Sequence, residues 1–134
     1  MQVFLVERAG RRHPAVRLSD GTLRFLCLLA ILCDPAPPPL IVIEEPELGL
    51  HADAIALVAR LLRAAAERTQ LIVTTHSDAL VDAFTDTPEV VVVVERDERG
   101  TKLRRLSRDV LSEWLEKYRL GPLWSMGVIG GNRW

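Results

Sequence analysis

The stretch Leu40-Ile-Val-Ile-Glu44-Glu45-Pro46-Glu47-Leu48-Gly49-Leu50-His51 decides which fold this chain is expected to adopt. Four consecutive apolar residues run into two carboxylates, a proline and a turn that contains glycine. A continuous apolar run is typical of a buried parallel strand, and ligands of open α/β sheets bind just beyond the carboxyl ends of such strands. Glu44 and Glu45 have no basic neighbour in the sequence, so we interpret them as a pair that holds Mg²⁺ and activates a water molecule.

Two other segments place polar residues at the ends of predicted elements. The apolar run 71–74 predicts a second strand, and it is followed by Thr75-His76-Ser77, in which His76 lies thirty-one residues after Glu45. Before the first strand, Leu18-Ser19-Asp20-Gly21-Thr22 opens a strongly apolar helix. A helix N-terminus with free N–H groups and a small hydroxyl binds anions. This segment therefore predicts an anion site, plain N-capping of the helix, or both.

The remaining sequence predicts an α/β fold, because strands and helices alternate along the chain. The helix over 22–33 is apolar nearly all round and is expected to be buried. The predicted elements are a strand over 3–6, a loop over 8–17, the helix over 22–33, strands over 40–44 and 71–75, a helix over 53–68, a short helix from a Ser77 cap to about 84, a buried strand over 90–94, a hairpin turn at 97–100 leading into 101–106, and a helix from a Ser107 cap to about 118.

Composition limits the classes of function that the chain can serve. With 134 residues it forms one domain at most, and its net charge of −1 provides no field that draws it to nucleic acid or an anionic membrane. We interpret the basic residues near 8–17 and 102–108 as solvated surface, with phosphate contact as the alternative.

The cysteines and the lack of targeting signals indicate a cytoplasmic protein. Cys27 and Cys33 lie six residues apart and point to different faces of the predicted helix. We expect both to be reduced and buried, as in cytosolic proteins. The first residues show no signal-peptide pattern, and the apolar run 25–33 is too short to cross a membrane.

The ordered motifs resemble those of ABC-type ATPase heads, and specifically the RecF- and SMC-like AAA family ATPases. Residues 18–22, namely Leu18, Ser19, Asp20, Gly21 and Thr22, resemble the ABC signature. Residues 43–46 resemble Walker B followed by the catalytic glutamate, which implies that Glu44 is the Mg²⁺ ligand and Glu45 the general base. Residues 47–51 resemble the D-loop and bring Gly49 and His51 to the nucleotide site, and His76 resembles the switch histidine. The ending 130–134 also resembles the C-terminus of such proteins.

The chain departs from the family pattern at several points. The phosphate-binding loop Gly-x-x-x-x-Gly-Lys-Ser/Thr has no counterpart, because the two lysines, Lys102 and Lys117, follow Thr101 and Glu116 and no Gly-Lys pair occurs. Only seventeen residues precede the signature, where the family places this loop. Glu44 stands where the family usually has Asp, Asp20 where it has Gly, and His51 where many members have Asp.

The resemblance implies a single partial ATPase domain over 1–134, with a P-loop NTPase-like partial parallel sheet flanked by helices and a C-terminal hairpin and helix. It implies ATP and Mg²⁺ as cofactors and a function in DNA repair or defence. The expected partner is a second ATPase head or the missing N-terminal half, with DNA and further copies of the chain as additional candidates. Because the phosphate-binding loop is missing, we expect the isolated chain to be inactive.

Two alternatives from other classes remain at this point. The first is a non-enzymatic interaction module or a gene remnant, which the absent Walker A motif favours. The second is a metal-dependent nuclease of the Toprim type, suggested by the valine run ending at Glu95 and by Asp97. Such sites need a later Asp-x-Asp on another strand, and none follows Asp97.

The missing phosphate-loop strand also predicts a gap in the sheet. In the related ATPases that strand lies between the strands that correspond to 71–75 and 90–94. Open apolar edges promote unwanted pairing, and buried unpaired amides are costly. We therefore expect one of three arrangements: direct pairing of 90–94 with 71–75, entry of the strand 3–6 into the gap, or a second chain that fills it.

Overall fold

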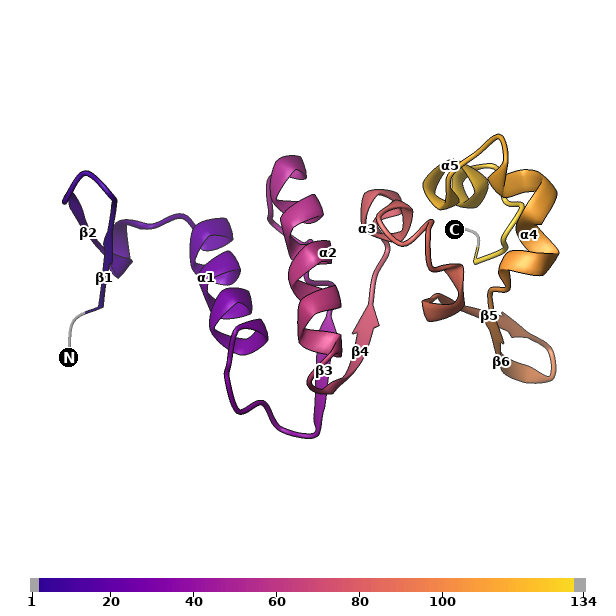
Figure 1. Cartoon of the computed structure of the whole chain (residues 1–134), viewed down its shortest axis with the longest axis horizontal. Helices are drawn as coiled ribbons and strands as arrows, with labels where there is room; N and C mark the ends of the chain where they lie inside the picture. Colours follow the sequence, from indigo (N-terminus) through magenta and orange to yellow (C-terminus); the bar gives the residue numbers. More distant parts are fainter. Residues whose placement is uncertain (1–2, 132–134) are drawn as a thin grey trace. The chain divides into compact units, whose positions relative to one another are not determined.

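The computed structural model describes residues 3–131 and divides the chain into two compact units, Met1–Thr74 and Thr75–Trp134. The elements are given below in chain order, and Figure 1 labels all of them except the two 3-10 helices. They are β1 (Phe4–Val6), β2 (Arg12–Pro14), the 3-10 helix η1 (Ala15–Arg17), α1 (Asp20–Leu32), β3 (Leu40–Glu44), α2 (Ala52–Ala66), β4 (Gln70–Thr74), α3 (Asp78–Asp82), the 3-10 helix η2 (Pro88–Val90), β5 (Val92–Asp97), β6 (Gly100–Arg105), α4 (Arg108–Leu115) and α5 (Leu120–Ser125).

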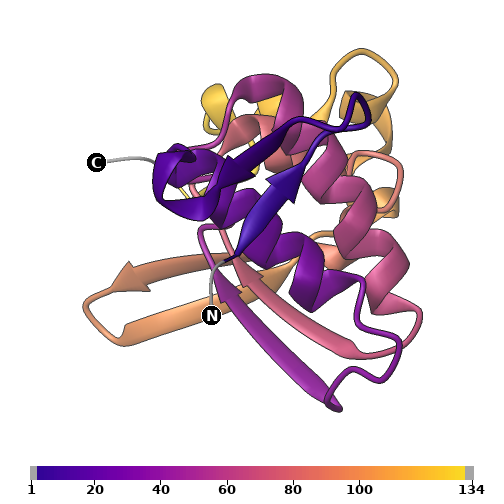
Figure 2. The same cartoon turned by 90° about the vertical axis from the view of Figure 1, so that its left-hand side faces the viewer.

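The first unit begins with the antiparallel hairpin β1–β2 (Figure 2). Leu5 pairs with His13 in this hairpin. The prediction of a loop over 8–17 is therefore only partly right, because its second half forms β2 and η1. The Arg12 guanidinium lies 4.5 Å from the centre of the Phe4 ring. This cation–π contact, which apolarity patterns do not reveal, adds to the cross-strand pairing.

The predicted capping by Ser19 is confirmed, but α1 begins at Asp20, earlier than the predicted start at residue 22. The expectation that it is buried all round is wrong, because only Leu28 and Leu32 are buried. Its packing neighbour is α2, so one face is covered and the others remain accessible. Cys27 and Cys33 are free cysteines and are exposed, which corrects the expectation that they are buried.

Strands β3 and β4 form the predicted parallel pair, with Glu44 opposite Thr74. Helix α2 lies along this pair and packs against β4, burying Val58, Ala59, Leu62 and Ala65 (Figure 1). The opposite side of the sheet is open, since Leu40, Val42 and Ile72 are 45%, 63% and 48% exposed. Parallel sheets are ordinarily covered on both faces, so this surface is incomplete in the single chain.

The second unit has its own core of seven buried side chains, Val81, Val93, Leu106, Leu111, Leu120, Leu123 and Ile129. The hairpin turn predicted at 97–100 is confirmed by the register of β5 and β6. The buried strand predicted over 90–94 is wrong, because Val90 ends η2 and Val94 is 57% exposed. Strand β5 belongs to a two-stranded antiparallel sheet, so successive side chains alternate between the core and solvent.

Neither intramolecular arrangement expected for the sheet gap occurs. Strand β5 pairs with β6 and β1 pairs with β2, and neither joins β3–β4. The physical reason is loop closure: both strands find a partner across a short turn, which costs less entropy than pairing with a distant strand. The third arrangement, a second chain at the edge of β3–β4, stays a prediction.

The helices of the second unit follow the sequence in part. Ser77 caps α3 by accepting a hydrogen bond from the Leu80 N–H. Ser107 occupies the N-cap position of α4, but its side chain makes no capping hydrogen bond, and α4 ends at Leu115 rather than near residue 118. In the part of the chain that the structure describes, no helix has the length and apolar character that a membrane crossing requires.

Candidate functional site

The acidic pair lies at the carboxyl end of β3. Glu44 is the last residue of the strand and is exposed, and Glu45 follows it with φ = 43°. Among residues 3–131, Glu45 is the one non-glycine residue with positive φ. Its N–H donates to the Thr74 carbonyl at 3.0 Å, and its carbonyl accepts from the Leu48 N–H at 3.1 Å. The surroundings hold Glu45 in a conformation that costs roughly 1–3 kcal/mol and that recurs at active sites.

The turn after the acidic pair is built from backbone hydrogen bonds and one glycine. The Leu50 N–H donates to the Glu47 carbonyl at 3.0 Å, and Gly49 adopts φ = 75°. His51 is the N-cap of α2, where its Nδ1 accepts from the Asp53 N–H at 3.3 Å. This contact establishes His51 as a helix cap, and its contact with nucleotide stays a prediction.

The predicted anion site is the N-terminus of α1. Ser19 Oγ accepts from the Thr22 N–H at 3.2 Å and lies 2.9 Å from Thr22 Oγ1. Asp20 occupies the first turn, and Leu18 precedes the cap with its N–H bonded to the Ala15 carbonyl. Capping of the helix is thus confirmed, and anion binding by the same turn stays a prediction.

Two contacts bring this helix N-terminus against the acidic turn. A Cβ on Gly21 would lie 2.4 Å from the carbonyl oxygen of Gly49, so the two backbones touch there. The Arg24 Nη1 donates to the Leu48 carbonyl at 2.9 Å. Residues predicted separately, in 18–22 and in 44–51, therefore share one region of the first unit. The contact of Arg24 was not predicted, although Arg24 is the one charged residue among 22–33 and this was the signal that could have revealed it.

His76 is an exposed residue of the second unit, in the short link between β4 and α3. Both of its neighbours in sequence are held by hydrogen bonds. The Ser77 N–H donates to Thr75 Oγ1 at 3.0 Å, and Ser77 Oγ caps α3. The backbone around His76 is thereby fixed to α3. Its action together with Glu45 stays a prediction.

The carboxylate at the end of β3 fits the requirements of the implied Mg²⁺ ion. No group of three or more His, Cys, Asp or Glu side chains is arranged around a common metal position within residues 3–131. Mg²⁺ at phosphate sites needs only one or two carboxylates, with the nucleotide phosphates and water completing its shell. The exposed Glu44 carboxylate at a strand end fits that requirement.

The carboxylates proposed for a nuclease have other partners. Glu95 Oε1 accepts from the Gly131 N–H at 3.1 Å. Asp97 pairs with Lys102 and accepts from the Arg99 N–H at 2.8 Å. The Lys102 ammonium is the main cause that lowers the pKa of Asp97 below its usual 3.8. This arrangement is that of a stabilised hairpin and does not favour the nuclease alternative.

Comparison with known proteins supports the ATPase resemblance. A solved structure described as "Structural biochemistry of ATP-driven dimerization and DNA stimulated activation of SMC ATPases" matches with a TM-score of 0.63 and 19% identity, over 87% of this chain and 71% of that chain. The chain thus shares the fold of that structure over the matched region. No curated protein matches the chain. Residues 2–82 match the family model described as "AAA domain, putative AbiEii toxin, Type IV TA system". Since this match covers more than half of the sequence, the chain belongs to that AAA domain family.

Proposed function

We propose that the chain supplies the signature, Walker B and switch-histidine half of an ATP-hydrolysing site. The observation that carries the proposal is Glu45, held at φ = 43° directly after a parallel strand. A strained acidic residue at the carboxyl end of such a strand is expected where chemistry requires a fixed carboxylate. Membership of the AAA domain family supports the same reading.

Each candidate residue then has a role that its position permits. Phosphoryl transfer depends mainly on positioning and on neutralising charge. Glu45 accepts the proton of the attacking water and orients it, and His76 donates a hydrogen bond to the terminal phosphate. Glu44 holds Mg²⁺, which neutralises phosphate charge when bound. The turn of α1 that contains Ser19 directs N–H groups and the positive end of the helix dipole at phosphate oxygens.

The rest of the site comes from a partner in this proposal. The 134 residues contain no Gly-Lys pair, so the phosphate-binding loop belongs to a second head or to a separate N-terminal half. The open face formed by Leu40, Val42 and Ile72 supports such a partner, because a parallel sheet needs a cover on that side. Both edges of β3–β4 also lack a strand neighbour within the described residues.

We place this ATPase in a cytoplasmic DNA-repair or defence system. The family description names a putative toxin of a toxin–antitoxin system, and the similar solved structure is described as DNA stimulated. With a net charge of −1, the isolated chain should bind DNA weakly. DNA contact would then require the completed assembly, and DNA-stimulated turnover of that assembly is its test.

Calorimetry with Mg-ATP tests the division of the site between two halves. The isolated chain should show no heat that fits micromolar binding, because the amides and lysine of a phosphate-binding loop supply most phosphate contacts. Joining the chain to a Walker A-bearing half of an AAA-family head should restore micromolar binding. Micromolar affinity in the isolated chain would refute the proposed division.

A further inference from the structure

Helix α3, which follows His76 and Ser77, is too short to be stable without contacts to other elements. It has five residues, Asp78–Asp82, whereas isolated helices below roughly 12–15 residues are marginal in water. Its position is therefore set by tertiary contacts. It packs on α5, where Leu80 and Val81 of α3 and Leu120 and Leu123 of α5 are all buried.

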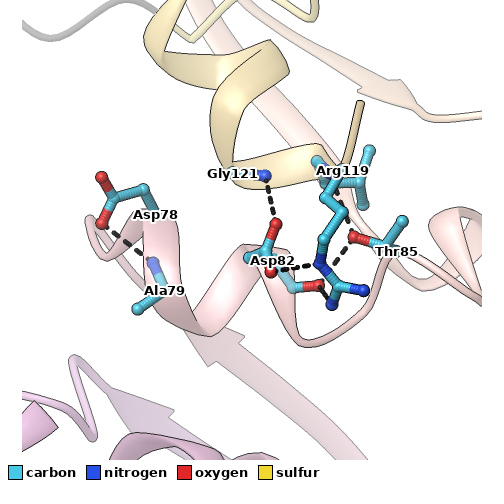
Figure 3. A network of polar contacts seen from close by, with 7 residues as sticks. Asp78, Ala79, Asp82, Thr85, Arg119 and Gly121 are labelled. Carbon is cyan, nitrogen blue, oxygen red and sulfur yellow. Dashed lines mark hydrogen bonds and ion pairs between the residues drawn. The ribbon is translucent and has the colours of Figure 1, made fainter. Parts of the chain in front are cut away.

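The two helices are also joined by a network of polar contacts around Asp82 (Figure 3). Asp82 Oδ2 accepts from Arg119 Nε at 2.6 Å, and Oδ1 accepts from the Gly121 N–H at 3.1 Å. The Asp82 carbonyl accepts from Arg119 Nη2 at 2.9 Å and from Thr85 Oγ1 at 2.7 Å. The same Thr85 hydroxyl accepts from the Leu120 N–H at 3.0 Å.

This network completes the N-terminus of α5. The first N–H groups of a helix have no partner inside it, and the N-cap residue Arg119 makes no side-chain capping bond. Asp82 and Thr85, from the α3 region, accept from Gly121 and Leu120 instead. A carboxylate at this end of a helix is also favoured by the helix dipole. Asp82 is therefore a residue of α3 that also stabilises α5.

Gly121 is what allows the two helices to approach so closely. A Cβ at this position would lie 3.0 Å from the Asp78 carbonyl oxygen, from Asp82 Cβ and from Asp82 Oδ1. The first of these neighbours is backbone, so a larger residue would push α5 away from α3. The separation of the helices is thus set by one glycine and one carboxylate.

The position of α3 fixes the backbone on both sides of His76, in the segment that joins β4 to α3. The Val81 N–H donates to the Ser77 carbonyl at 3.0 Å, and the Leu80 N–H donates to Ser77 Oγ at 3.2 Å. Ser77 in turn donates to Thr75 Oγ1. Hydrogen bonds thus join α5, α3 and the residues on both sides of His76 in one connected path.

We propose that Asp82, Arg119 and Gly121 form a latch that positions His76, so that α5 sets the orientation of the phosphate-sensing histidine. The role of His76 rests on the proposed function, whereas the latch itself is a property of the free chain. Arg119 and Gly121 lie beyond residues 2–82, which match the family model, so the positioning element comes from outside that segment. Asp82 acts through His76 and is a positioning residue.

Histidine NMR of the full chain tests the latch without nucleotide. The chain has three histidines, and His13 and His51 lie in the first unit, where they serve as internal references. In Asp82→Ala and Gly121→Ala, the His76 ring signals should shift or broaden while those of His13 and His51 stay in place. Asp109→Asn, which removes a carboxylate from exposed Asp109 on α4, should leave all three unchanged.

If Asp82→Ala unfolds the second unit, a series of milder substitutions at Asp82 and Arg119 still tests the latch. Arg119→Lys retains the cation but loses the two-pronged contact, so it should move His76 less than Arg119→Ala does. Asp82→Asn and Arg119→Gln remove the same contact between the two side chains. Their effects on the His76 ring signals should therefore be non-additive in the double variant. Unchanged His76 signals in folded variants, or equal changes at His13 and His51, would overturn the latch.

Kinetics of a completed head separate this inference from the proposed function. If His76 senses phosphate, Arg119→Lys and Gly121→Ala should lower kcat by about ten- to a hundredfold with little change in KM, as expected for misplacement of a catalytic group by about 1 Å. A His76 signal that moves while kcat stays constant would support the latch and refute the phosphate role of His76. A kcat that falls while His76 stays in place would overturn the latch.

Discussion

Replacing Gly21 with alanine tests whether the α1 N-terminus and the acidic turn form one structural unit. Helix propensity alone favours alanine over glycine by about 1 kcal/mol. Against this gain, the new Cβ would lie 2.4 Å from the Gly49 carbonyl oxygen, where ordinary contact begins at 3.4 Å. The two backbones must therefore separate by about 1 Å (3.4 − 2.4 Å). Such overpacking costs about 1–3 kcal/mol.

The same separation strains a second contact. Arg24 donates to the carbonyl of Leu48, beside Gly49, and a hydrogen bond to a charged group contributes about 1.5–3 kcal/mol. We expect Gly21→Ala to lower the free energy of unfolding by about 1–2 kcal/mol after the propensity gain is subtracted. For a chain of this length, Tm should then fall by about 4–8 °C.

Urea and thermal unfolding monitored by circular dichroism measure this change. Ala30→Gly is the matched control, because Ala30 lies exposed in the same helix and reports propensity alone, with an expected loss of about 1 kcal/mol. Amide signals of 44–51 should shift in Gly21→Ala and stay unchanged in Ala30→Gly. A rise of Tm in Gly21→Ala, with an undisturbed turn, would refute the contact between helix and turn.

Three further predictions concern backbone strain, helix ends and pH. Glu45→Gly should be about 1 kcal/mol more stable than Glu45→Ala in urea unfolding, since both lose the carboxylate and only glycine relieves φ = 43°; equal stabilities would argue against strain. Arg68 donates to the Leu32 and Asp34 carbonyls at 2.7 and 2.8 Å, so Arg68→Ala should lower the free energy of unfolding by about 1–3 kcal/mol. The control Arg60→Ala, at an exposed position, should change it by less than about 0.5 kcal/mol. The pKa of Asp97 is lowered, chiefly by Lys102, so ionised Asp97 stabilises the fold above pH 3.8, and this contribution is lost as the pH falls through the lowered pKa. At pH 6 the free energy of unfolding of the wild type should therefore slightly exceed that of Asp97→Asn, and the difference should shrink towards pH 2. A difference that grows towards pH 2 would contradict the assignment.

The features that the sequence predicted correctly are those encoded locally. Ser19 and Ser77 cap their helices because a hydroxyl just before a helix meets N–H groups two or three residues later. The parallel pair β3–β4 follows from apolar runs that end in polar residues. The turn over 97–100 follows from glycine at its last position, which adopts φ = 121°.

The features that the sequence did not reveal depend on distant partners. Five consecutive valines predicted a buried strand, but only the last three lie in β5, which pairs with β6 of the same hairpin and leaves Val94 exposed. The helix α1 looked buried because its sequence is apolar, yet it has one packing neighbour among the longer helices. The contact of Asp82 with Arg119 joins residues 37 positions apart, a separation that no local pattern encodes.

The residues of the candidate site remain a prediction, and what the fold adds is the contact between two of its segments. Each of the segments 18–22 and 44–51 was recognised by its residue types, whereas their contact through Gly21 and Gly49 emerged only in the fold. Glycine in the first turn of a helix is a poor helix former, and that was the signal that could have revealed a close approach. The strained conformation of Glu45 likewise had no signal in its residue type.

Turnover by a completed head tests the central claim most directly. The chain joined to a Walker A-bearing half should hydrolyse Mg-ATP, and Glu45→Gln, which keeps the shape of the side chain but removes its basicity, should lower kcat by at least about a hundredfold. Binding of Mg-ATP, measured by calorimetry on the same proteins, should stay unchanged. Glu98→Gln, at an exposed position of the β5–β6 turn, is the matched control and should retain full turnover. A head that binds Mg-ATP and hydrolyses it equally well with Glu45→Gln would contradict the assignment of this chain as the catalytic half.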